Sequence, residues 1–74
     1  MTIEQIFADV FAIPADSVHD GLELRKIASW DSLSHMLLII RIEELFATEF
    51  TGDEILDVAS VGDVKKLLDR KRDR

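Results

Sequence analysis

Residues 30–46 read WDSLSHMLLIIRIEELF, and this stretch decides the fold. It starts with polar residues and continues as the most apolar segment of the chain. Asp31 is a residue type favoured at a helix N-cap, where its carboxylate accepts hydrogen bonds from free backbone N–H groups of the first turn. We therefore predict a helix from about Ser32 to Ala47, with Asp31 as its cap.

The serine after this cap is the main candidate for chemistry. Ser32 falls at the first helical position, where its hydroxyl points toward water and nothing nearby in the sequence activates it. A helix N-terminus presents unpaired N–H groups and the positive end of the helix dipole, both of which suit a phosphate ester. The position therefore favours Ser32 as the attachment point of a phosphate-linked group.

The predicted helix is apolar around more of its circumference than one core contact requires. A helix in a small bundle normally keeps one side in water. The sequence gives three rows: Met36, Ile39 and Phe46, with Glu43 in register; Leu38, Ile42 and Leu45; and Leu33, Leu37 and Ile40, with Glu44 in register. All three rows could be buried, but we interpret the third as a partner surface.

The N-terminal part of the chain predicts a first helix and a long connection. Thr2 and Gln5 have the spacing of a capping box, and Pro14 ends the helical pattern near Ala12. Residues 13–31 then form a connection with a turn at Asp20-Gly21. A loop of this length is normally functional or packed down by its own side chains. We expect its apolar residues to pack onto the bundle: Val18, Leu22, Leu24, Ile27 and Trp30.

Two more helices are predicted after residue 47. Asp53 can cap a short one from Glu54 to Val58. Ser60 and Asp63 resemble a second capping box, which opens a last helix from Val61 to about Arg72 with Val64, Leu67 and Leu68 on its inner side. With no strand alternation and no repeat, the prediction is an all-α fold, a small four-helix bundle whose third helix is short, forming a single domain over residues 1–74.

The charge distribution narrows the class of partner. The net charge of the 74 residues is −6, but residues 1–64 hold 13 acidic and 3 basic residues. This acidic body argues against nucleic acid and favours basic protein surfaces. The basic segment 65–74 could indicate nucleic acid or a membrane, but cations are also favoured at a helix C-terminus, and we prefer that interpretation.

Other residue types give little support to metal binding, secretion or a membrane span. The chain has no cysteine, which fits a cytoplasmic location, and its two histidines, His19 and His35, lie too far apart to suggest a metal site. The longest apolar run, from Met36 to Ile40, is far shorter than the roughly 20 residues of a membrane span. No signal peptide is visible, so we expect a cytoplasmic location. We also expect the protein to be a monomer.

Three stretches resemble the acyl carrier proteins and peptidyl carrier proteins, the phosphopantetheine-binding domains. Trp30-Asp31-Ser32-Leu33-Ser34 resembles the attachment motif of that family. Ile42-Glu43-Glu44-Leu45-Phe46 is similar to the end of its second helix. Residues 48–61 also follow the family's pattern into its third and fourth helices, so that the resemblance covers nearly the whole chain.

This resemblance implies a carrier rather than an enzyme. It implies that Ser32, between Asp31 and Leu33, bears 4′-phosphopantetheine through a phosphodiester, and that the thiol of this arm holds an acyl group as a thioester. The implied partners are a phosphopantetheinyl transferase, an acyl- or aminoacyl-loading ligase, acyltransferases, a ketosynthase or other pathway enzymes. Their docking residues would lie on the second helix: Leu33, Ser34, Leu37, Ile40, Glu43 and Glu44.

The predicted docking side also departs from the family. Carriers of fatty acid synthesis commonly have acidic residues there, whereas this chain has Ser34, Leu37 and Ile40 in the upper part. We therefore expect a discrete carrier of a specialised lipid, polyketide or related pathway. An aminoacyl or peptidyl carrier remains an alternative, as does a helical interaction module without a prosthetic group. A hydrolase using Ser32 and His35 has little support, because the Gly-x-Ser-x-Gly motif is missing.

Overall fold

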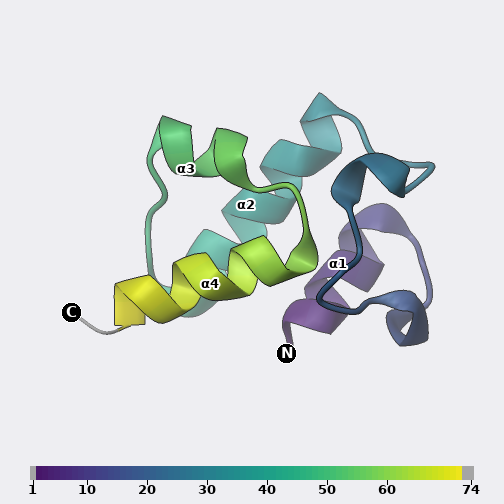
Figure 1. Ribbon diagram of the computed structural model, residues 1–74, viewed down its shortest axis with the longest axis horizontal. Coiled ribbons are helices and arrows are strands. Elements are labelled where there is room, and N and C mark those ends of the chain that lie inside the picture. Colours follow the sequence, from purple (N-terminus) through teal and green to yellow (C-terminus); the bar gives the residue numbers. More distant parts are fainter. Residues whose placement is uncertain (1, 73–74) are drawn as a thin grey trace.

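Four α-helices and two 3₁₀ turns account for most of the chain in the computed structural model, which describes residues 2–72, without the side chain of residue 72. The all-α prediction is confirmed: within these residues the only β-type pairing is an isolated bridge between Glu23 and Ser60. Figure 1 shows α4 crossing in front of α2, with α3 at one side and α1 at the other. The elements are α1 (Ile3–Phe11), η1 (Ala15–Ser17), η2 (Leu24–Lys26), α2 (Ser32–Phe46), α3 (Gly52–Asp57) and α4 (Val61–Arg72).

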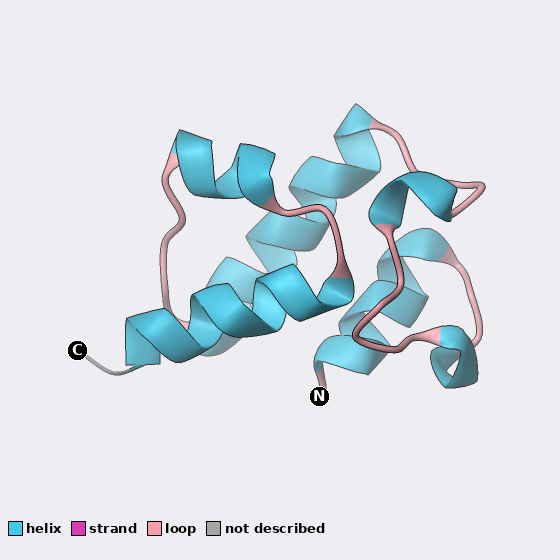
Figure 2. Ribbon diagram, in the orientation of Figure 1, coloured by secondary structure: helices cyan, strands magenta, loops and turns pink. Residues whose placement is uncertain are grey.

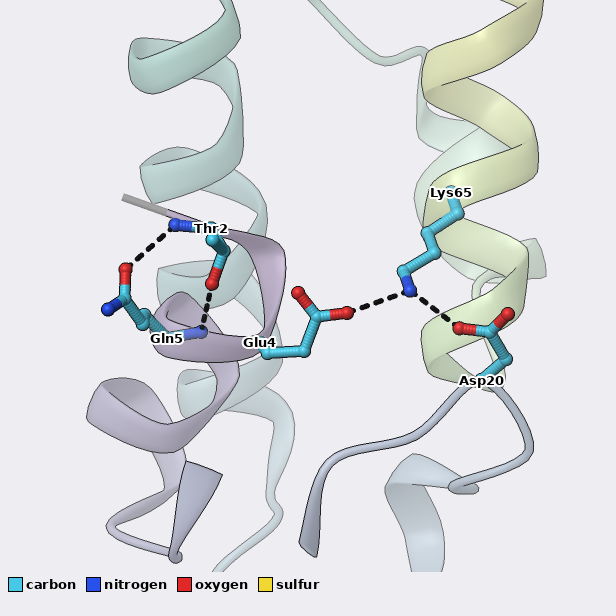
Figure 3. Close-up of polar contacts among 5 residues, drawn as sticks. All are labelled: Thr2, Glu4, Gln5, Asp20 and Lys65. Carbon is cyan, nitrogen blue, oxygen red and sulfur yellow. Dashed lines mark hydrogen bonds and ion pairs between the residues drawn. The ribbon is translucent and has the colours of Figure 1, made fainter. Parts of the chain in front are cut away.

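Helix α1 begins and ends where the sequence indicates. The Thr2 hydroxyl accepts from the Gln5 backbone N–H at 3.1 Å, and the Gln5 side chain accepts from the Thr2 N–H at 2.9 Å (Figure 3). The helix stops at Ala12, which has the left-handed conformation common at helix C-termini. The predicted capping box is therefore confirmed.

The long connection packs against the helices, as predicted. Val18, Leu24 and Ile27 are buried, while Leu22 and Trp30 are partly buried against the core. The Ser29 hydroxyl donates to the carbonyl of Phe11 at 2.7 Å. In Figure 2 the connection covers one end of the molecule with its two short turns, and the predicted turn at residues 20–21 is present.

Helix α3 corrects one prediction. Its cap is Thr51 rather than Asp53, and the helix covers Gly52–Asp57 instead of 54–58. The Thr51 hydroxyl accepts from the Glu54 N–H at 3.1 Å, and the Glu54 carboxylate accepts from the Thr51 N–H at 2.9 Å. Because Thr51 and Glu54 form this reciprocal box, Asp53 falls in the first turn, where its negative charge still favours the helix dipole.

Helix α4 starts with half of the predicted capping box. The Ser60 hydroxyl accepts from the Asp63 N–H at 3.2 Å, but the Asp63 carboxylate accepts from Ala59 N–H rather than from that of Ser60. Gly62 is the second residue of α4, and its N–H donates to the Asp20 carbonyl at 2.8 Å. A Cβ at Gly62 would lie 3.0 Å from that oxygen, so this close approach favours glycine.

Lys65 on α4 connects the last helix to the N-terminal half. Its ammonium lies 2.8 Å from the Glu4 carboxylate and 2.6 Å from that of Asp20 (Figure 3). The bond to Asp20, and then the bond to Glu4, raises the pKa of Lys65, and the bond from Lys65 lowers the pKa of Glu4. Exposed ion pairs of this kind stabilise weakly. Most of the stability therefore comes from the core, in which Phe7, Leu38 and Val64 are buried and against which Ile55 of α3 packs.

Candidate functional site

The N-terminus of α2 is fixed by two polar residues. The Asp31 carboxylate accepts from the Ser34 N–H at 2.7 Å, which confirms Asp31 as the cap. The Ser34 hydroxyl accepts from the Asp31 N–H at 2.9 Å and contacts the Asp31 carbonyl at 3.0 Å. The hydrogen bond from the Ser34 N–H lowers the pKa of Asp31, so this carboxylate remains charged at neutral pH. This use of Ser34 was not predicted from the sequence, because a capping box normally has Glu or Gln at that position.

Ser32 is the first residue of α2 and its side chain is exposed. Its hydroxyl makes no hydrogen bond to any residue from 2 to 72, whereas the Ser34 hydroxyl is bonded to the cap. The two serines of the motif therefore differ in chemical availability. Ser32 has the free hydroxyl, and it lies beside the N–H groups and positive dipole of a 15-residue helix.

A hollow of about 450 Å³ lies beside Ser32, between the connection, α2 and α3. Its size is within the range of sites for small molecules. Apolar side chains make up most of its wall. The hollow was not predictable from the sequence, because its residues come from separate segments. The lining residues are Leu24, Arg25, Trp30, Ser32, His35, Met36, Ile55, Leu56, Val58 and Ala59.

His35 is part of this wall, and both of its ring nitrogens form hydrogen bonds within the protein. Its Nδ1 accepts from the indole N–H of Trp30 at 3.2 Å, and its Nε2 lies 3.0 Å from the carbonyl oxygen of Ile55. A carbonyl only accepts, so the hydrogen-bond network assigns the ring proton to Nε2. The Nδ1 lone pair is then used by Trp30. His35 is consequently not available as a base for Ser32, which agrees with the weak support for a hydrolase. His19 is an exposed loop residue, as expected.

The outward side of α2 is apolar. Leu33, Leu37 and Ile40 are 71%, 48% and 44% exposed, as predicted for the third row. The other two rows are buried only in part, because the core covers Leu38, Ile39 and Ile42 in the middle of the helix. Nearer its ends, three members of these rows are exposed instead: Met36, Leu45 and Phe46.

The two glutamates of the predicted docking side differ in the structure. The Glu43 carboxylate accepts a hydrogen bond from the Phe50 N–H at 2.9 Å and is half-buried. Glu44 is exposed. Glu43 therefore fastens the segment after α2, a role that sequence reasoning missed because its partner lies seven residues away in a loop.

Comparison with known proteins identifies the family. Residues 2–68 match the family model described as phosphopantetheine attachment site. The chain belongs to the acyl carrier protein family. The solution structure of the holo acyl carrier protein from Geobacter metallireducens is similar to this carrier at 33% identity and a TM-score of 0.85, covering 97% of this chain and 83% of that one. The acyl carrier protein from Enterococcus faecalis is similar at 27% identity and a TM-score of 0.65, covering 92% and 95%. No curated protein matches the chain.

Membership of this family makes the chain a carrier and not an enzyme, with covalently bound phosphopantetheine as its prosthetic group. The N-terminus of α2 fits that group, because Ser32 offers an unbonded hydroxyl beside a hollow with mostly apolar walls. Among residues 2–72, no helix is long and apolar enough to span a membrane. In the same part of the chain, no cluster of three or more metal-ligating side chains is present.

Proposed function

We propose that this protein carries acyl groups on a 4′-phosphopantetheine attached to Ser32 through a phosphodiester. The observation that carries the proposal is the exposed, unbonded hydroxyl at the first position of α2, within the segment that matches the family. Asp31 holds the first turn in place, and Leu33 presents an exposed apolar side chain on the other side of the serine. The thiol of the bound arm supplies the thioester chemistry.

The chain contributes position rather than catalysis. A tethered intermediate is presented to successive active sites at a high effective concentration, without a new encounter from solution for each step. The rigid cap at Asp31 fixes where the arm leaves the protein, and the hollow beside Ser32 offers an apolar surface close to that point.

Leu33, Leu37 and Ile40 are the docking surface in this proposal, with Ser34, Glu43 and Glu44 at its edges. The first three expose apolar area on one side of the helix that begins at Ser32. Partners that approach Ser32 from this side are a phosphopantetheinyl transferase, a loading ligase, acyltransferases and a ketosynthase or related enzyme. The acidic charge of residues 1–64 favours partners with basic surfaces.

The apolar character of this surface supports a specialised lipid, polyketide or related pathway over the housekeeping one. Carriers of fatty acid synthesis commonly have acidic residues along the exposed side of this helix, whereas this chain has Ser34, Leu37 and Ile40 in its upper part. We further propose that residues 1–74 form one carrier domain, acting as a monomer in the cytoplasm.

Intact mass spectrometry tests the attachment. The purified chain is incubated with coenzyme A and a promiscuous phosphopantetheinyl transferase, and we expect its mass to increase by one phosphopantetheine group. The S32A variant should keep the fold and show no increase, because Asp31 still caps the helix. The matched control is S34A, which removes the neighbouring hydroxyl and should still be loaded. An unmodified wild-type chain would support the interaction module without a prosthetic group.

A further inference from the structure

His35 joins three segments of the wall around the hollow. It projects from α2, its Nδ1 accepts from Trp30 in the connection, and its Nε2 bonds to the carbonyl of Ile55 in α3. The two rings meet edge to face, with centroids 6.0 Å apart and an angle of 85° between their planes. All three residues line the hollow beside Ser32. A single imidazole therefore forms hydrogen bonds from α2 to both the connection and α3.

The two bonds respond differently to a proton. The indole N–H of Trp30 can only donate, so its bond requires an unprotonated Nδ1. Protonation of Nδ1 would place two N–H donors against each other and break the contact with Trp30. The bond to Ile55 would survive, because Nε2 carries a proton in both states and donates more strongly from a charged ring.

We propose that His35 is a proton-sensitive latch on the hollow beside Ser32. The neutral ring holds Trp30 in the wall, and the protonated ring releases it while keeping α3 attached. Histidine suits this role because it is the side chain whose charge ordinarily changes between pH 5 and 8. The latch is a property of the polypeptide and does not depend on what is attached to Ser32.

The charged groups near the ring do not pair with it. Arg25 lines the same hollow from η2 and makes no ion pair within residues 2–72. The Asp31 carboxylate, one turn earlier on α2, is bonded to the Ser34 N–H. On α3, Glu54 is paired with Lys71, and Asp53 and Asp57 are exposed. None of these carboxylates is hydrogen-bonded to the ring.

The only tryptophan of the chain reports directly on the latch. The unloaded protein is titrated from pH 8 to pH 5.5 while the indole N–H resonance of Trp30 and its fluorescence are recorded. We expect the resonance to lose the shift of a hydrogen-bonded N–H as the pH falls. Methyl resonances of Leu24 and Ile55 at the hollow should change with the same midpoint, whereas those of Ile6 and Val64 in the core should stay constant.

Two glutamine variants give the matched controls. H35Q removes the titrating ring from the wall, and its Trp30 signals should no longer change over this range. H19Q removes the exposed loop histidine and should titrate like the wild type. If H35Q does not fold, the nitrogen signals of the His35 ring in the wild type decide, because the latch requires an Nε2–H tautomer at pH 8.

Three results would overturn the proposal: constant Trp30 signals in the wild type, a titration that persists in folded H35Q, or core and wall resonances that change together as in global unfolding. The S32A variant should retain the full titration. Failure of the latch and failure of phosphopantetheine attachment are therefore separate outcomes.

Discussion

The two faces of α2 are built from the same residue types and have opposite surroundings. Leu38 is completely buried, whereas its neighbour Leu37 is 48% exposed. Buried apolar area stabilises a fold by about 25 cal/mol per Å², so the inward face accounts for most of what this helix contributes to stability. The outward face, with Leu33 and Ile40, contributes little and can be used for contacts with other molecules. The apolar residues of the two faces do not differ in type. The position of each residue around the helix decides whether it is buried or exposed.

The largest expected effect is the difference in the free energy of unfolding between alanine variants of the two neighbouring leucines. L38A should lower the free energy of unfolding by about 2–5 kcal/mol, because it removes buried methyl groups and leaves a cavity. L37A, with the same chemical change, should alter it by less than about 0.5 kcal/mol. Urea unfolding of both variants measures the difference. Equal losses of unfolding free energy in the two variants would show that Leu37 and Leu38 do not lie on an exposed and a buried face.

A smaller loss of stability is expected when the N-cap of α2, which precedes both faces of the helix, is removed. D31A should lower the melting temperature at pH 7, since it removes the carboxylate that accepts from the Ser34 N–H and caps α2. The pKa of Asp31 is lowered in the folded state, so its stabilising effect is present above the unfolded value of about 3.9 and is lost as the pH falls through the folded value. The difference between D31A and the wild type should therefore shrink below pH 4. The control is T2A, whose neutral cap on α1 should give no such dependence.

Salt should change the melting temperature less than D31A does, through the acidic charge on the surface. Residues 1–64 carry 13 acidic and 3 basic residues, and their repulsion destabilises the compact state at low ionic strength. We expect salt or divalent cations to raise the melting temperature, although they also screen the exposed ion pairs of Lys65. Thermal melts from low to moderate ionic strength measure the effect, and a melting temperature independent of salt would argue against clustered acidic charge.

The smallest change in stability is expected for L37E, which places a charge on the outward face. Because Leu37 is already half exposed, the free energy of unfolding should change by less than about 0.5 kcal/mol. Transfer reactions with the enzymes of its own pathway should be lost, since the apolar docking surface is interrupted. Activity with enzymes that prefer acidic carriers should increase. A melt lowered by tens of degrees would place Leu37 in the core instead.

Much of this fold can be predicted from local sequence. Asp31 as a cap, the Thr2–Gln5 box and the outward position of Leu37 depend on spacings within one or two helical turns. The errors arise where two local solutions compete: Thr51 and Asp53 are both good caps, and the Thr51–Glu54 box is the one that forms. Contacts between distant segments were not predictable, because no periodicity relates His35 to the Ile55 carbonyl twenty residues away. The hollow beside Ser32 depends on such contacts.

The most direct test of the account is the position of the prosthetic group in the loaded wild-type protein. Cleavage after Lys26 and Arg41 releases residues 27–41, which contain Ser29, Ser32 and Ser34. Fragmentation of this peptide by mass spectrometry assigns the added mass to one of the three. The account predicts that all of it lies on Ser32, the serine with the free hydroxyl at the start of α2. Added mass on Ser29, on Ser34 or outside this peptide would contradict it.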